Sequence, residues 1–470
     1  MNNIIDKYID KYIDIPKKIN DKLVYKSGMM RSPLLNNIQI PIIYADYTAS
    51  GRPSPIIEEF LQKTIYPKYS NTHSNASNGI LMKTIIADTK DYIRKQLNIS
   101  SDYQIIFSGN GTTGAINQLI NCIDYTLYDN IIIYLSLYEH YSNHVPWIEL
   151  IHPNKKIIYI PFVEDSDMID ISFLDCSINE IYNNLLTNQQ TLIICSISAC
   201  SNINGKITDS KSIKRILNKY QKTDYFNIYY FADYACSAPY VNIDGSIYDA
   251  FFFSPHKFIG GVSTPGILIS KSCLFMKSKP YCVGGGCVKK ASLTNVEYDS
   301  NLEKKESAGT PNIIGIIKIK NILKLKNTFK SVISTNEHII YQLIIYKINN
   351  FKETYPNFKP ILYTTNKHLP ILSFAIDNLH YNFIVVLLND KFGIQTRGGI
   401  GCCGLLAEYI ETKYNIRGWC RISFHWLMPM KTILYIFDAL EYIIRNGHDY
   451  LQYYTYDSEQ NLYYFKRLID

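Results

Sequence analysis

The alternation of strand-like and helix-like segments between about residues 80 and 270 is the feature that most constrains the fold of this chain. Short apolar segments rich in β-branched and aromatic residues are typical of buried strands. Here they span residues 104–107, 130–135, 156–160, 191–197, 227–231 and 249–253. Segments with helical spacing of apolar residues precede or separate them, as at residues 81–97 and 115–122. Because such alternation forms βαβ units, we expect an α/β fold whose mainly parallel sheet is flanked by helices.

The pattern changes beyond about residue 320, which indicates a second domain. A long helix is expected over residues 313–351, followed by shorter elements. These are strands at 361–363, 369–376 and 420–424 and helices at 381–388 and 430–445. We therefore expect an N-terminal helical extension over residues 1–40, a large α/β domain over 41–320, and a small α+β domain over 321–470 that ends in a hairpin.

The composition excludes several classes of protein. The chain has 470 residues, of which 47% are hydrophobic and 19% charged, the profile of a soluble globular protein. Its net charge is +7, but the basic residues are scattered along the chain, so we expect no nucleic-acid partner. No apolar run suits a membrane span or a signal peptide. The eleven cysteines show no CxxC pair, so we expect a cytoplasmic chain with reduced thiols and no structural metal.

The stretch from Asp249 to Gly261 carries the strongest candidate for covalent chemistry. An apolar strand ends here and is followed directly by Ser254, His256 and Lys257. A lysine next to an apolar strand can be partly desolvated, which makes its amine a nucleophile towards carbonyl carbon, as in Schiff-base lysines. The alternative is an ordinary solvated lysine.

The loop from Ser108 to Gly114 lies between a predicted strand and a predicted helix. Gly111, Thr112 and Thr113 would let backbone N–H groups and hydroxyls close on a phosphate at the helix N-terminus. The loop also matches the dinucleotide pattern GxGxxG, with Glu139 as the ribose-binding acid. The third alternative is a plain helix start.

Other polar residues follow the remaining strands. His140 could stack on a planar ring, or cap a helix. Asn202 offers an amide at the same sheet edge. Asp233 follows an apolar strand, where a buried acid needs a cationic partner such as a protonated heteroaromatic nitrogen. Its alternative is to cap a turn.

In this order, a phosphate cradle, a ring-stacking histidine, a buried acid and a Schiff-base lysine describe a site for pyridoxal 5'-phosphate (PLP). From about Ile42 to Leu440 the chain resembles the class V aminotransferases of PLP fold type I, and among them the cysteine desulfurase and selenocysteine lyase branch.

The resemblance implies a role for each cofactor-site residue. Lys257 would hold PLP covalently and serve as the catalytic base, and His140 would stack on its ring. Asp233 would pair with the ring nitrogen and Asn202 with the ring oxygen. The remaining residues would bind the phosphate; they are Gly111, Thr112, Thr113, Ser254, His256 and, from the neighbouring subunit, Thr310. The last of these implies a homodimer with shared active sites.

The resemblance also assigns the residues that would bind the substrate and react with it. Arg397 begins a loop in which Cys402 falls on the sulfur-accepting cysteine, and Arg421 matches the arginine that grips the substrate carboxylate, with Asn202 nearby. Two adjacent cysteines that simply pack in a loop are the alternative, and the sequence leaves open whether Cys402 or Cys403 reacts.

Two departures from the desulfurase pattern leave other activities open. Ile400 and Gly401 stand where many desulfurases carry histidines, and Cys236 stands where they often carry Gln or His. The sequence thus predicts removal of sulfur or selenium from a cysteine-type amino acid through a Cys402 persulfide, with a protein as sulfur acceptor. The alternatives are an aminotransferase or another PLP-dependent lyase, a nucleotide-binding oxidoreductase, and a scaffold without activity.

Overall fold

The computed structural model describes residues 11–186, 188–220, 223–364 and 367–466, which form two compact units. The central unit comprises residues 51–200 and 208–328. The terminal unit comprises the chain up to residue 50, residues 201–207 and the chain from residue 329. Each unit is described by itself.

A seven-stranded sheet forms the centre of the central unit, with the strand order β4-β10-β9-β8-β7-β5-β6. Only β10 runs antiparallel to its neighbours. The strands are β4 (Tyr103–Ser108), β5 (Asn130–Ser136), β6 (Lys155–Ile160), β7 (Thr191–Ser198), β8 (Phe226–Asp233), β9 (Ala250–Phe253) and β10 (Gly266–Lys271). The mainly parallel sheet expected from the sequence is therefore confirmed, and each expected strand agrees within one or two residues.

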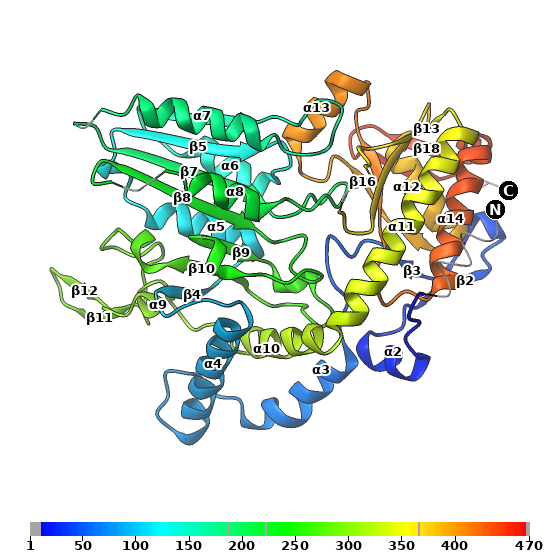
Figure 1. Cartoon of the computed structure of the whole chain (residues 1–470). Helices are drawn as coiled ribbons and strands as arrows, with labels where there is room; N and C mark the ends of the chain where they lie inside the picture. The colour runs from blue at the N-terminus through cyan, green and yellow to red at the C-terminus, as the bar shows by residue number, and fades with distance from the viewer. Residues whose placement is uncertain (1–10, 187, 221–222, 365–366, 467–470) are drawn as a thin grey trace. The chain divides into compact units, whose positions relative to one another are not determined.

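Helices cover both faces of this sheet, and Figure 1 shows α5 and α7 on opposite sides of it. The helices of the unit are α3 (Pro55–Phe60), α4 (Ser77–Gln96), α5 (Gly111–Cys122), α6 (Tyr141–Glu149), α7 (Ile171–Asn183), α8 (Ser210–Leu217), α9 (Leu302–Lys305) and α10 (Ile313–Thr328). A small hairpin, β11 (Val288–Ala291) with β12 (Val296–Tyr298), adds to it.

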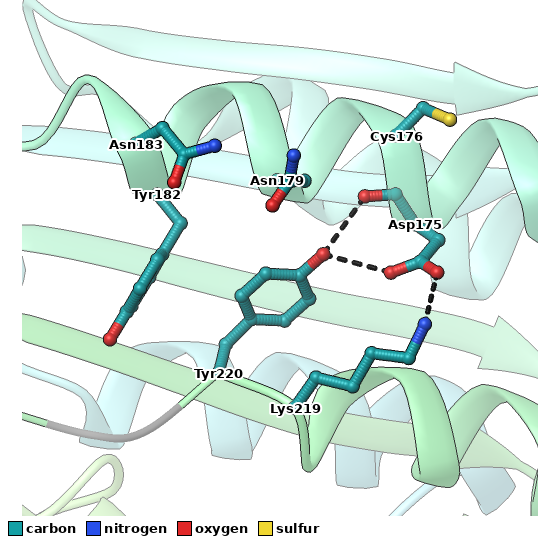
Figure 2. Close-up of a pocket in the computed structure, with 7 residues that line it drawn as sticks. All are labelled: Asp175, Cys176, Asn179, Tyr182, Asn183, Lys219 and Tyr220. Atoms are coloured by element: carbon teal, nitrogen blue, oxygen red, sulfur yellow. Dashed lines mark hydrogen bonds and ion pairs between the residues drawn. The ribbon is translucent and has the colours of Figure 1, made fainter.

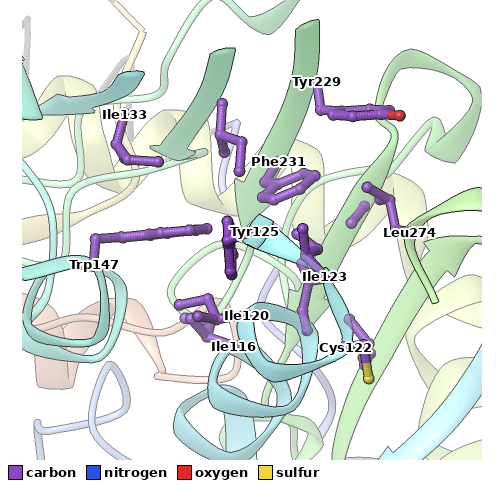
Figure 3. Packing of buried hydrophobic residues seen from close by; sticks show 14 of the residues in the cluster. Ile116, Ile120, Cys122, Ile123, Tyr125, Ile133, Trp147, Tyr229, Phe231 and Leu274 are labelled. Atoms are coloured by element: carbon purple, nitrogen blue, oxygen red, sulfur yellow. The ribbon is translucent and has the colours of Figure 1, made fainter. Parts of the chain in front are cut away.

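An apolar core of the central unit lies between the sheet and helices α5 and α6. Ile116 and Ile120 of α5 and Trp147 of α6 pack against strand residues such as Ile133 and Phe231 (Figure 3). Burial of each such side chain contributes about 1.5–3 kcal/mol. This packing fixes the start of α5 against the ends of the strands.

The terminal unit is built on a four-stranded antiparallel sheet, β13-β14-β17-β16. Its strands are β13 (Phe358–Pro360), β14 (Ile371–Ile376), β16 (Arg397–Gly399) and β17 (Trp419–Ser423). Its helices are α2 (Lys17–Leu23), α11 (Lys330–Thr354), α12 (Tyr381–Phe392), α13 (Gly404–Tyr414) and α14 (Met430–Asn446). The strand pair β1 (Met29–Arg31) and β2 (Gln39–Pro41) and the terminal hairpin, β18 (Tyr454–Asp457) with β19 (Leu462–Phe465), complete it.

The limits of the two units differ from the three consecutive segments expected from the sequence. Residues 41–50 belong to the terminal unit because β3 (Ile43–Tyr44) pairs in parallel with β15 (Ile394–Gln395). Pairing between segments so far apart leaves no trace in local composition. Of the expected N-terminal helix, residues 1–10 lie outside the described residues, and α2 begins only at Lys17.

Two expected elements of the C-terminal half are wrong. The single helix expected over residues 313–351 is two helices, α10 and α11, separated at Phe329 where the chain leaves the central unit. Apolar periodicity continues across this break, so it could not mark the end of α10. The strand expected at residues 361–363 is absent there; β13 lies just before it, at Phe358–Pro360. Within the described residues, no helix combines the length and the apolar character that crossing a bilayer requires.

Candidate active site

The candidate cofactor residues of the central unit follow four strands that run in the same direction. Strands β4, β5, β8 and β9 therefore end at the same edge of the sheet. The loop at Gly111 follows β4, His140 follows β5, Asp233 ends β8, and Ser254 to Lys257 follow β9. Parallel sheets bind ligands at this edge.

The loop at Gly111 and the residues after β9 form one cradle. The backbone N–H of Thr112 donates to Ser254 Oγ at 2.9 Å. Gly111 has a φ of +60°, and a Cβ built on it would lie 2.7 Å from Ser254 Oγ and 2.9 Å from His256 Cε1. Only glycine fits there, and α5 begins at this residue, so its N-terminal N–H groups favour an anion.

The imidazole of His256 is neutral at physiological pH. Burial and the charge of Lys257 lower the pKa of His256 to about 4. A neutral imidazole can donate one hydrogen bond to a phosphate oxygen without adding a charge.

His140 and Thr113 both contact Ser142. The Ser142 N–H donates to His140 Nδ1 at 3.1 Å, so His140 caps α6 as one interpretation of the sequence expected. Thr113 Oγ1 lies 2.7 Å from Ser142 Oγ. The cap restrains the imidazole ring; its stacking role stays a prediction.

Asp233 is a buried acid at the end of β8, with 4% of its surface exposed. Burial raises its pKa to about 6, while a hydrogen bond from Ala235 N at 2.8 Å and the charge of Lys257 act in the opposite direction. A protonated ring nitrogen beside it would offset the cost of burying its charge. The glycine-only cradle and this buried acid fit PLP.

Glu139 does not suit the ribose-binding role that a dinucleotide site would need. It is fully buried and accepts hydrogen bonds from Ser136 Oγ, Asn143 Nδ2 and both the N–H and Oγ of Ser198. Its carboxylate therefore ties the ends of β5 and β7 together, and both of its oxygens are already engaged by the protein.

The candidate substrate-binding residues lie around Arg421 of β17 in the terminal unit. Its Nη1 donates to the carbonyl of Asn202 at 2.9 Å, and its Nη2 donates to Asp46 Oδ1 at 2.8 Å. Arg397 Nε donates to the other oxygen of Asp46 at 3.2 Å. The structure thus brings Asn202, Arg397 and Arg421 together; their role in substrate binding stays a prediction.

The two adjacent cysteines of this unit differ in environment. Cys402 is exposed and adopts a φ of +58°, directly after Gly401 at +62°. Cys403 is fully buried, and its thiol donates to Asn202 Oδ1 at 2.8 Å. Only Cys402 of this pair is accessible to a reagent.

Sequence reasoning did not name Asp46 as a site residue. The pattern that pointed to Asp233, an acid directly after a short strand, is also present at Asp46. Thr310, whose expected partner is another subunit, accepts a hydrogen bond from Asn71 Nδ2 at 3.3 Å within the central unit.

A cavity of about 390 Å³ lies between α7 and the residues that follow α8 (Figure 2). Asp175 contacts both Lys219 and Tyr220 there. Because Tyr220 leads into β8 and Asn183 leads towards β7, this cavity lies near the amino ends of the strands. It is therefore separate from the edge that carries the cofactor residues.

Comparison with known proteins agrees with this arrangement. The family model named aminotransferase class V matches residues 43–435. The chain belongs to the class V aminotransferase family, whose members depend on PLP, and it is therefore a PLP-dependent enzyme.

Several proteins to which the chain is similar are named cysteine desulfurases. One from Wigglesworthia glossinidia brevipalpis is 33% identical over 82% of this chain and 88% of its own. A probable cysteine desulfurase from Borreliella burgdorferi is 30% identical over 83% of this chain and 89% of its own. The apo structure of a cysteine desulfurase from Thermococcus onnurineus shares the fold, with a TM-score of 0.74 and 20% identity over 92% of this chain and 99% of that one.

Proposed function

We propose that this enzyme is a cysteine desulfurase that removes sulfur, or selenium, from a cysteine-type amino acid and retains it on Cys402. The observation that carries the proposal is the contrast between the exposed Cys402 and the buried, hydrogen-bonded Cys403 in the unit that holds Arg421. The names of the relatives support it.

The residues of the central unit would hold the cofactor and move one proton. Gly111 to Thr113, Ser254 and His256 would bind the phosphate, and Asp233 would accept a hydrogen bond from the protonated ring nitrogen. Bound PLP supplies the electron sink that makes the substrate's Cα–H bond acidic. The amine of Lys257 would take that proton as a general base.

The residues of the terminal unit would bind the substrate carboxylate and accept the sulfur. Arg421, with Arg397 and Asn202, would bind the carboxylate. The Cys402 thiolate would attack the substrate's sulfur, forming an S–S bond. The C–S bond would break with its electron pair going to carbon, which takes a proton to give alanine, and Cys402 would keep the sulfur as a persulfide.

The homodimer, the sulfur-acceptor protein and the cytoplasmic location belong to the same proposal. The exposed Thr310 would contact the phosphate held by the neighbouring subunit. An acceptor protein would take the sulfur from Cys402, whose thiol is exposed. None of the eleven cysteines forms a disulfide in the part of the chain that the structure describes, which is typical of a reducing compartment.

Aminotransferase or other lyase activity is the second candidate. It is favoured by Cys236, which is buried three residues after Asp233 where desulfurases often carry Gln or His. The two activities differ in their products.

The test is an absorption spectrum of the purified protein followed by incubation with L-cysteine and a reductant. We expect a visible PLP band that is lost in Lys257→Ala, and sulfide and alanine in equal amounts. A keto acid without sulfide would favour the aminotransferase, and no band after soaking with PLP would contradict both candidates.

A further inference from the structure

The carboxylate of Asp46 is shared by the two arginines of the candidate substrate site. One oxygen accepts from Arg421 Nη2 at 2.8 Å and the other from Arg397 Nε at 3.2 Å. The backbone holds this arrangement in place, because the Ser423 N–H at the end of β17 donates to the carbonyl of Ala45 at 2.7 Å. Asp46 is thus fixed beside the strand that carries Arg421.

One buried N–H donor of the Arg421 side chain lacks an acceptor among the described residues. Its side chain is 4% exposed, two of its nitrogens donate to Asp46 and to Asn202, and its Nε has no hydrogen-bond partner among the described residues. A buried N–H without an acceptor is unfavourable. An acceptor from outside the chain, such as a carboxylate, would satisfy it.

The charge of this cluster follows from its composition. Two guanidinium groups and one carboxylate carry a net charge of +1, which a single substrate carboxylate neutralises. An amino acid with a second acidic group would bring a further negative charge close to Asp46. Such a charge would be repelled by the carboxylate of Asp46, whose side chain is 14% exposed.

We propose that Asp46 is a positioning and specificity-determining residue, which orients Arg421 and Arg397 and limits the site to amino acids whose only acidic group is the α-carboxylate. This inference rests on the proposed function, in which Arg421 binds the substrate carboxylate. An ion pair with a purely structural role would affect all amino acids alike.

The test compares the binding of L-alanine and L-aspartate, followed by the change each causes in the absorption band of the PLP-loaded enzyme. In Asp46→Asn, the ratio of the two dissociation constants should move about tenfold in favour of L-aspartate, because the site then carries two positive charges. Glu411→Gln is the matched control: it removes one acid of the same unit, which pairs with Arg417 at the surface, and should leave the ratio unchanged.

A second variant keeps the proposal testable if Asp46→Asn does not fold. Arg397→Gln removes one positive charge, so it should move the same ratio in the opposite direction, against L-aspartate. A ratio that stays at the wild-type value in a folded variant, while the wild type produces sulfide from L-cysteine, would overturn the role of Asp46 and leave the desulfurase intact. A wild type that produces no sulfide would overturn both.

Discussion

The buried thiol of Cys403 donates to the side-chain oxygen of Asn202 at a distance of 2.8 Å. The amide nitrogen of the same asparagine donates to the carbonyl of Gly401 at 2.9 Å. Asn202 therefore anchors the loop on both sides of Cys402. The exposed thiol is presented by a restrained backbone, although it lies in a segment rich in glycine.

Replacing each cysteine of the pair separates their roles. Cys402→Ser should lower sulfide release at least about a hundredfold, because no thiolate remains to attack the substrate's sulfur. The PLP band should be unchanged. Cys403→Ser should keep most of the activity, since a hydroxyl can still donate to Asn202. Assays of sulfide with L-cysteine check this, and the reverse pattern would assign the reaction to Cys403.

Gly111→Ala should weaken PLP binding. The added Cβ would lie within 3 Å of Ser254 and His256, and the residue's φ of +60° is strained for alanine, at a cost of about 1–3 kcal/mol. Gly109→Ala is the control, because a Cβ there meets no heavy atom within 4 Å among the described residues. Spectrophotometric titration with PLP measures both variants. Equal losses in the two would contradict the cradle.

Asp233 should make the stability of the PLP-free protein depend on pH. Its pKa is raised from 3.8 to about 6, so the folded state binds the proton more tightly than the unfolded state does. As the pH rises from about 4 to 6, the free energy of unfolding should therefore fall by about 3 kcal/mol relative to that of Asp233→Asn. Above about pH 6 the difference between the two proteins should stay constant. Denaturant titrations of both PLP-free proteins measure this difference. Parallel pH profiles would contradict it.

Glu139→Gln should destabilise the protein. The carboxylate accepts four hydrogen bonds in a fully buried position, and an amide turns one acceptor into a donor that faces other donors. The loss should be about 1–3 kcal/mol. Thermal or denaturant unfolding measures it. An unchanged stability would mean that Glu139 does not join β5 to β7, and binding of a dinucleotide would revive its ribose role.

The sequence allowed much of the central unit to be predicted, because its information there is local. Apolar strands alternate with helices, so Gly111, His140, Asp233 and Lys257 could be assigned to one sheet edge from their positions after strands. Strand β10 was not among the expected strands, and its antiparallel direction depends on its partners in the sheet.

The terminal unit was less predictable because its contacts join distant segments. Asp46 lies more than three hundred residues before Arg397 and Arg421, and no local pattern links an acid to partners at that separation. The end of α10 at Thr328 was also missed, because the apolar residues of α10 and α11 continue the same spacing across it.

The pairing of β3 with β15 has a consequence for synthesis of the chain. Proteins emerge from the ribosome N-terminus first, so Asp46 is made long before either arginine that it binds. The charge cluster can form only after Arg421 of β17 has been synthesised, 375 residues after Asp46. A nascent chain stopped before residue 397 therefore contains every candidate cofactor residue of the central unit but neither arginine, so the charge cluster around Asp46 is assembled after the candidate cofactor residues have been synthesised.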